Sequence, residues 1–154
     1  MSKPRPKIGI VGSSGGHLFQ LYTLQEWWTQ FDRFWVTFDK PDAVSLLEIE
    51  RKYFAHFPTN RNLVNLVRNF FLAAKILRRE KPDVLVSTGA ALAFPFFILG
   101  KMMGAKLVFI EVFDRLDSPT LTGKLVYPFC DKFLIQWEEQ RQFYPQAEFW
   151  GQTL

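Results

Sequence analysis

The stretch that decides the fold is Lys7-Ile8-Gly9-Ile10-Val11-Gly12-Ser13-Ser14-Gly15-Gly16-His17-Leu18. Its apolar run, residues 8–11, predicts a buried parallel strand. The glycine-rich turn then leads into apolar residues at helical spacing, Leu18, Leu21 and Tyr22. A strand, a tight turn and a helix in this order aim backbone N–H groups and the positive helix end at one point, which suits an anion.

The glycine spacing leaves two interpretations of this turn open. It reads Gly12-x-x-Gly15-Gly16, which differs from the GxGxxG fingerprint of dinucleotide folds, and it has no P-loop lysine. Gly12, Ser13, Ser14, Gly15 and Gly16 therefore either bind a phosphate or only let the strand turn sharply into the helix.

Composition limits the class of protein. The 154 residues predict a single domain, 1–154, and 48% of them are hydrophobic and 17% aromatic. The net charge of +4 is compatible with anionic lipid or phosphate partners. We expect no cofactor. We also expect no metal, because the His and Cys residues lack the spacing of metal ligands. No nucleic-acid partner is expected, because the sequence has no basic-aromatic motif. The longest uncharged stretch, 84–100, is too short and too polar for a membrane-spanning helix.

Apolar runs alternate with helical patterns along the whole chain. Strands are expected at 8–11, 33–38, 53–57, 83–87, 106–111, 132–136 and 148–150, and helices at 18–28, 42–51, 62–80 and 90–103. This alternation predicts an α/β fold with a Rossmann-like parallel sheet flanked by helices. Ligands of such sheets bind outside the carboxyl ends of the strands. Those ends carry the turn 13–17, Asp39, Ser87-Thr88-Gly89 and Glu111.

The helix at 62–80 has two predicted faces. An apolar face is expected to pack on the sheet, and it consists of Leu63, Leu66, Val67, Phe70, Ala74 and Leu77. A basic stripe lies opposite and is bordered by two apolar side chains; the members are Arg61, Arg68, Lys75 and Arg79, with Val64 and Phe71. Basic and apolar residues together are typical of a helix that lies on anionic lipid. The alternative is an ordinary surface helix with solvated charges.

Few residues are candidates for chemistry. His17 begins a helix, where a neutral imidazole can hold or accept the proton of a hydroxyl, although a backbone-bonded histidine is an equal alternative. Ser87, Thr88 and Gly89 offer hydroxyl and N–H groups to a phosphate. Glu111 is expected to bond a sugar hydroxyl or to orient a loop.

Two further groups have structural explanations. His56 lies in a Phe-rich strand and is interpreted as a core histidine. The charged segment 114–117 precedes Ser118, interpreted as a helix N-cap with Pro119 in the first helical position, so capping alone explains it.

Several motifs together resemble one family of glycosyltransferases. Residues 12–17 and 81–90 resemble the glycine loop and the strand-turn of the N-terminal half of GT-B enzymes related to the peptidoglycan lipid-linked GlcNAc transferase. The segments 109–115, 118–125, 131–137 and 144–145, in this order, resemble the membrane-anchoring subunit of the two-part UDP-GlcNAc transferase that builds dolichol-linked chitobiose. The likeness covers essentially the whole chain and includes the bacterial exopolysaccharide and capsule counterparts of that subunit.

The resemblance implies half of a GT-B enzyme, whose other half is a separate UDP-sugar-binding glycosyltransferase subunit. It implies that the turn 12–16 and Ser87, Thr88 and Gly89 face the acceptor diphosphate, with Glu111 beside them. The eukaryotic subunit carries an N-terminal membrane helix, whereas residues 1–7 are too short for one. Attachment is therefore expected to be peripheral, on the cytoplasmic face of the cell membrane, through the helix at 62–80.

We accordingly expect an acceptor-binding, membrane-recruiting subunit of a two-component inverting transferase, inactive or weakly active alone. Its acceptor is expected to be a polyprenyl-diphosphate-linked sugar in exopolysaccharide, capsule or lipid-linked oligosaccharide synthesis, and His17 and Glu111 are the catalytic candidates. The alternatives are a non-catalytic scaffold that enhances a partner and a stand-alone nucleotide-sugar enzyme. A dinucleotide oxidoreductase is disfavoured by the missing fingerprint.

Overall fold

The computed structural model describes residues 5–59 and 61–153, so predictions that involve Met1 to Pro4, Asn60 or Leu154 lie outside it. Within that part of the chain, seven strands form one parallel sheet in the order β3-β2-β1-β4-β5-β6-β7. The strands are β1 (Lys7–Gly12), β2 (Asp32–Thr37), β3 (Lys52–Phe54), β4 (Val84–Gly89), β5 (Lys106–Ile110), β6 (Lys132–Ile135) and β7 (Glu148–Phe149). The predicted Rossmann-like parallel sheet is confirmed.

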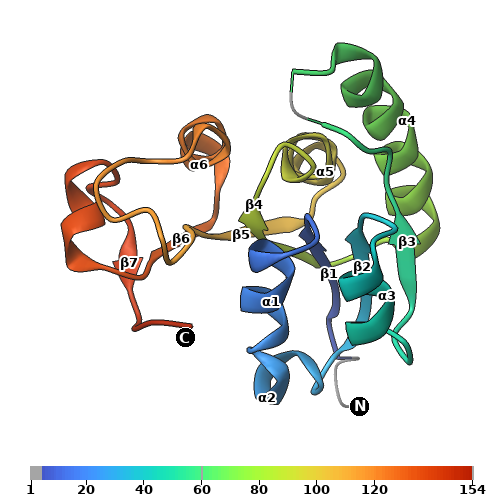
Figure 1. Cartoon of the computed structure of the whole chain (residues 1–154), viewed down its shortest axis with the longest axis horizontal. Helices are drawn as coiled ribbons and strands as arrows, with labels where there is room; N and C mark the ends of the chain where they lie inside the picture. The colour runs from blue at the N-terminus through green and yellow to red at the C-terminus, as the bar shows by residue number, and fades with distance from the viewer. Residues whose placement is uncertain (1–4, 60, 154) are drawn as a thin grey trace.

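Helices cover both faces of the sheet (Figure 1). One layer holds α4 (Leu63–Glu80), α5 (Ala93–Met102) and α6 (Leu121–Val126), and the other holds α1 (Gly16–Tyr22), α2 (Gln25–Trp28) and α3 (Pro41–Leu46). Two short 3-10 helices, η1 (Tyr127–Phe129) and η2 (Glu138–Gln142), flank β6. Because side chains alternate along a strand, β1 sends Ile8 and Ile10 into the core under α1 and Val11 into the core under α4 and α5.

The prediction of which face α4 buries is wrong. The buried side chains are Asn65, Asn69, Ala73, Ile76, Leu77 and Glu80. Of the six residues expected inside, only Leu77 is fully buried, whereas Leu63 and Val67 are 77% and 53% exposed.

Two asparagines explain this rotation of α4. The Asn69 amide accepts from the N–H of His56 (2.9 Å) and donates to its carbonyl (3.2 Å), and Asn65 donates to the carbonyl of Pro58 (2.7 Å). Both amides satisfy the backbone of the segment after β3, which has no further strand to pair with. The helix therefore turns both asparagines inward and turns Leu63, Val64 and Val67 outward.

Other local predictions also need correction. The expected strand at 53–57 ends at Phe54, and the His56 side chain is exposed rather than in the core, because only its backbone is held by Asn69. The helix expected at 42–51 ends at Leu46, after which the chain turns back to bring Glu50 to Arg33 and Trp35.

The helix expected at 90–103 begins only at Ala93, because Ala90 has left-handed backbone dihedrals. The helix after the charged segment is capped by Thr120 rather than Ser118, since the Thr120 hydroxyl accepts from the N–H of Gly123 (3.0 Å).

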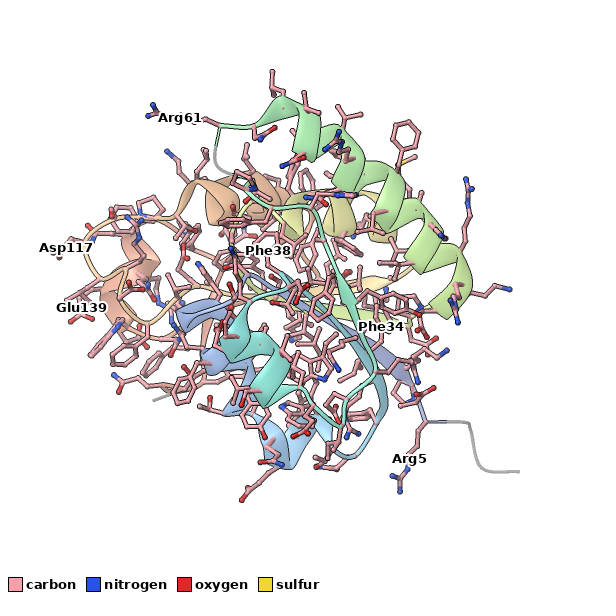
Figure 2. The ribbon with its side chains drawn as sticks, turned by 45° about the vertical axis from the view of Figure 1, so that its right-hand side comes forward. Arg5, Phe34, Phe38, Arg61, Asp117 and Glu139 are labelled. Atoms are coloured by element: carbon pink, nitrogen blue, oxygen red, sulfur yellow. The ribbon has the colours of Figure 1, made fainter. Side chains whose placement is uncertain are left out.

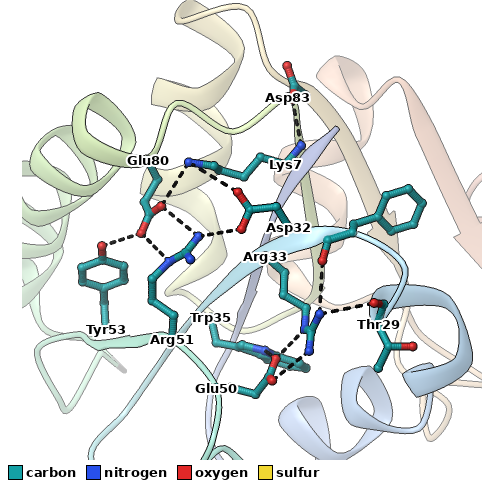
Figure 3. Close-up of polar contacts among 11 residues, drawn as sticks. Lys7, Thr29, Asp32, Arg33, Trp35, Glu50, Arg51, Tyr53, Glu80 and Asp83 are labelled. Atoms are coloured by element: carbon teal, nitrogen blue, oxygen red, sulfur yellow. Dashed lines mark hydrogen bonds and ion pairs between the residues drawn. The ribbon is translucent and has the colours of Figure 1, made fainter. Parts of the chain in front are cut away.

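A charged cluster ties the amino ends of the first strands to the end of α4 (Figure 3). The buried carboxylate of Glu80 accepts from Arg51 (3.0 Å to Nε) and from the Tyr53 hydroxyl (2.5 Å), and Lys7 lies 3.5 Å away. Arg51 also reaches Asp32 at 3.2 Å. This cluster lies at the amino ends of the strands, opposite to the carboxyl ends that carry the candidate site. It therefore stabilises the fold and takes no part in the site.

Candidate functional site

The strand order reverses between β1 and β4, and the ends of these two strands form the candidate site. From β1 the chain proceeds outward to β2 and β3, then returns past β1 to β4. Gly12 at the end of β1 pairs with Gly89 at the end of β4. Such a reversal opens a crevice in which open α/β sheets bind their ligands. The structure thus brings together the two predicted segments 12–17 and 87–89.

His17 and Thr88 join the two strand ends by a reciprocal pair of hydrogen bonds. The Thr88 hydroxyl donates to the carbonyl of His17 (2.8 Å), and Nδ1 of His17 lies 3.2 Å from the carbonyl of Thr88. A carbonyl can only accept, so Nδ1 carries the proton of the neutral ring and Nε2 carries the lone pair. No described residue hydrogen-bonds to Nε2. The ring is therefore oriented and can accept a proton at Nε2.

The surroundings of His17 keep its imidazole neutral. Burial lowers the pKa, and this effect outweighs the Thr88 carbonyl and the Asp114 and Glu111 carboxylates, which raise it; Arg115 lowers it further. The net pKa is below the ordinary value of 6.5. Both alternatives for His17 are thus present in one side chain: Nδ1 bonds the backbone, and Nε2 remains available for chemistry.

Gly89 borders this imidazole in a backbone conformation that favours glycine. Its φ is +121°, and a Cβ at this position would lie 3.4 Å from Cε1 of His17 and 3.4 Å from Cζ of Phe109. Ala90 follows with φ of +67°, a left-handed conformation that costs a non-glycine residue about 1 kcal/mol or more. The chain at the end of β4 thus contains two successive residues with positive φ, and the first of them borders His17.

The hydroxyls of Ser87 and Thr88 are used inside the protein. Both residues are fully buried, and Ser87 accepts from the N–H of Gly89 (3.0 Å) while Thr88 binds His17. They shape the turn that carries Gly89 rather than offer hydroxyls to solvent.

The glycine turn is open to solvent but one of its donors is already engaged. Gly15, with φ of +85°, and Gly16 are exposed, and nothing lies within 4 Å of a Cβ built on either. The N–H of Gly15 donates to the carboxylate of Asp42 at 2.6 Å. The sequence pattern does not indicate this contact, because Asp42 lies 27 residues further along the chain.

Glu111 is buried and holds a loop. Its carboxylate accepts from the N–H of Val112 (3.1 Å), from the N–H and the hydroxyl of Thr120 (3.1 and 2.9 Å) and from the Tyr144 hydroxyl. These four donors use the carboxylate fully. The geometry thus favours the loop-orienting alternative for Glu111 over contact with a sugar.

The loop 112–120 is supported by buried amides that the sequence analysis missed. Oε1 of Gln20 accepts from the N–H of Phe113 (3.2 Å) and from Nε2 of Gln136 (2.8 Å), and Nε2 of Gln140 donates to the carbonyl of Arg115 (2.7 Å). The indole of Trp137 donates to the carbonyl of Phe113 (2.7 Å). Glutamines are usually exposed, so nothing in the sequence marks these as buried.

An apolar groove of about 440 Å³ lies on the α1 and α2 side of the sheet, below β4, β5 and β6. Its floor is Val86, Val108, Ile110 and Leu134. Its sides are Leu24, which precedes α2, Trp27 of α2 and the segment 150–153. Figure 1 shows that the carboxyl-terminal segment runs on the same side of the sheet as α1.

The outer face of α4 is both apolar and basic. Leu63, Val64, Val67 and Phe71 are 53–77% exposed. Of the predicted stripe, Arg68, Lys75 and Arg79 are exposed on α4. Arg61 is also exposed but precedes the helix, and Figure 2 shows it extending from the chain before the amino end of α4. Among the described residues, no helix has both the length and the apolar character needed to cross a bilayer.

Comparisons with known proteins identify the family of this site. The family model of Alg14-like oligosaccharide biosynthesis proteins matches residues 8–153. The chain belongs to this family. Two relatives are named UDP-N-acetylglucosamine transferase subunit ALG14: the Yarrowia lipolytica protein, 26% identical over 95% of this chain and 80% of its own, and the human protein, 21% identical over 98% and 85%. The suspected family resemblance is confirmed.

Solved structures support the GT-B assignment of the Alg14-like fold. Acinetobacter baumannii MurG superposes with a TM-score of 0.72 at 15% identity, over 87% of this chain and 43% of MurG. The UDP-N-acetylglucosamine 2-epimerase from Rickettsia bellii gives 0.75 at 14% identity, over 97% and 45%. The chain thus spans less than half the length of these structures and has the fold of one of their halves.

Proposed function

We propose that this Alg14-like chain is the acceptor-binding, membrane-recruiting subunit of a two-component, inverting UDP-sugar glycosyltransferase. The observation that carries the proposal is the open Nε2 of a neutral, oriented His17 at the crevice between β1 and β4. The acceptor is a polyprenyl-diphosphate-linked sugar, and the companion subunit brings the UDP-sugar. Membership in a family whose relatives are named transferase subunits supports this assignment.

His17 acts as the general base in this proposal. As the acceptor hydroxyl oxygen attacks the anomeric carbon, its proton passes to Nε2 of His17 and the bond to UDP breaks. Attack opposite to the leaving UDP inverts the anomeric centre. Thr88 keeps the ring oriented through Nδ1, and closure of the companion over the crevice excludes water.

Membrane recruitment is assigned to the outer face of α4. Side chains such as Phe71 enter the headgroup region while the arginines and Lys75 meet anionic phosphates. In this proposal the chain lies on the cytoplasmic face of the cell membrane and acts on lipid-linked acceptors of exopolysaccharide, capsule or lipid-linked oligosaccharide synthesis.

The apolar groove favours a second candidate function, a scaffold that enhances its companion without a catalytic group. Much of the groove floor is apolar side chain, as expected of a surface that a protein covers. In this candidate, His17 is only the structural link between β1 and β4.

The test is a UDP-release assay with a lipid-linked acceptor, using this chain, its companion (sought first in the adjacent reading frame) and both together. We expect transfer only from the pair, and a loss of about 100-fold or more in kcat for His17→Ala and His17→Gln. His56→Ala is the matched control, because His56 is exposed and follows β3, which β2 separates from β1. Full activity of His17→Ala would favour the scaffold, and turnover by the single chain would contradict the two-component proposal.

A further inference from the structure

The glycine turn by itself offers too few positively charged or N–H groups to bind a diphosphate. The N–H of Gly15 already donates to the carboxylate of Asp42 at 2.6 Å, and that carboxylate places a negative charge at the turn. Ser87 and Thr88 direct their hydroxyls to protein atoms. A diphosphate at this crevice therefore requires a cation from another element.

The loop after β5 lies over the start of α1. The N–H of Phe113 donates to Gln20, which is one helical turn after His17 on the same side of α1. The carbonyls of Phe113 and Arg115 accept from Trp137 and Gln140, both at 2.7 Å. Buried side chains thus hold the backbone of an exposed loop in place, which is the support that positions a binding residue.

Arg115 lies on this loop with an exposed side chain. Among the described residues it has no ion pair within 4.0 Å, and its side-chain contact is a 3.5 Å approach to the Ser118 hydroxyl. Lys40, which follows β2, lies over the ring of Phe57 at 3.8 Å. Arg115 can therefore bind an anion without breaking an existing ion pair.

We propose that Arg115 binds the diphosphate of a substrate beside His17. The guanidinium makes paired N–H contacts to phosphate oxygens, a geometry that a lysine ammonium does not reproduce. This inference rests on the proposed function and deepens it. Diphosphate is common to the lipid-linked acceptor and to the UDP-sugar, and the experiment separates these two sources.

The experiment compares Arg115→Gln and Arg115→Lys with Arg5→Gln as the matched loss of one positive charge. Arg5 lies across the molecule from this loop, as its distance from Asp117 in Figure 2 shows. Inorganic pyrophosphate is titrated into each chain alone, followed by NMR, and KM for acceptor and for UDP-sugar is measured in the reconstituted pair. Arg115 is exposed, so the thermal midpoint is expected to stay the same in all variants.

We expect Arg115→Gln to weaken pyrophosphate binding about 10-fold or more, with partial rescue in Arg115→Lys and no effect of Arg5→Gln. If Arg115→Gln raises only the KM for the acceptor, by about the same factor, the contact is assigned to the lipid-linked diphosphate. If it raises only the KM for the UDP-sugar, the contact is assigned to the donor. Unchanged pyrophosphate affinity together with unchanged KM values would overturn the inference while leaving the function standing. Absence of transfer by the wild-type pair would instead contradict the proposed function, and the pyrophosphate titration would still decide on Arg115.

Discussion

At the scale of single residues, the site depends on one imidazole held from two sides. Thr88 contributes both its hydroxyl and its carbonyl to His17, and Gly89 borders the ring. A side chain at Gly89 meets the ring at 3.4 Å and must also adopt a φ of +121°, which L residues rarely do. The orientation of His17 is thus a property of β4 as much as of the glycine turn.

The pH dependence of transfer tests this environment. Only the neutral ring accepts a proton, so kcat/KM falls as the pH drops through the pKa of His17. Burial places that pKa below 6.5, so we expect the acid limb of the pH profile to lie below pH 6.5. The measurement is kcat/KM of the reconstituted pair across the acid range.

A substitution at Asp114 sharpens the same test. The Asp114 carboxylate raises the pKa of His17, so Asp114→Asn is expected to move the acid limb to still lower pH. Glu26→Gln removes an equal charge on α2 and serves as the control. An acid limb at or above pH 6.5, or one that Asp114→Asn leaves in place, would contradict the role of His17 as base.

At the scale of elements, α4 shows how buried amides set the rotation of a helix. Asn65 and Asn69 satisfy the backbone after β3, and this requirement outweighs the burial of Leu63 and Val67. Exposing a large apolar side chain forgoes about 1.5–3 kcal/mol. The apolar outer face is therefore a costly feature in water, and contact with lipid removes that cost.

Vesicle binding tests this face of α4. We expect Arg68→Gln with Arg79→Gln to weaken binding to phosphatidylglycerol-containing vesicles about 10- to 30-fold, at about 1 kcal/mol per charge. Phe71→Ser is expected to weaken binding to the same vesicles by loss of apolar insertion. Co-sedimentation measures both effects. The control is Arg5→Gln with Arg141→Gln, and vesicle affinity equal to that control would exclude α4 as the membrane surface.

At the scale of the whole molecule, the two ends of the parallel strands carry different groups of residues. The carboxyl ends carry His17, the glycine turn and Arg115, whereas the amino ends are tied together by the cluster around Glu80 (Figure 3). Burial raises the pKa of Glu80, but the Tyr53 hydroxyl, Arg51 and Lys7 outweigh burial and hold it below its ordinary value. The charged form of Glu80 therefore stabilises the fold.

Glu80→Gln is expected to lower the free energy of unfolding by about 1–2 kcal/mol at pH 7, and the Tm by about 2–8 °C, because it removes a charged partner of Arg51. The loss stays this small because Arg51 is half-exposed and solvent partly screens the pair. A carboxylate whose pKa is lower in the folded than in the unfolded protein stabilises the fold at pH values above the unfolded pKa of about 4.5. This stabilisation is lost as the pH falls through the pKa of the folded state. The difference between wild type and variant should thus shrink below pH 4.5. Thermal unfolding across pH measures it, and Glu138→Gln, in an exposed pair, should change Tm little; a pH-independent difference would contradict this account.

The sequence alone determined the strand and helix order, the parallel sheet and the meeting of 12–17 with 87–89, because periodicity and glycine turns act over short distances. Tertiary structure decided the rotation of α4, the burial of Glu111 and the support of Arg115. Those features depend on partners far apart in the chain, such as Gln20 and Gln136, which are 116 residues apart. A buried polar group is stable only where a distant partner satisfies it, and no local pattern specifies that partner.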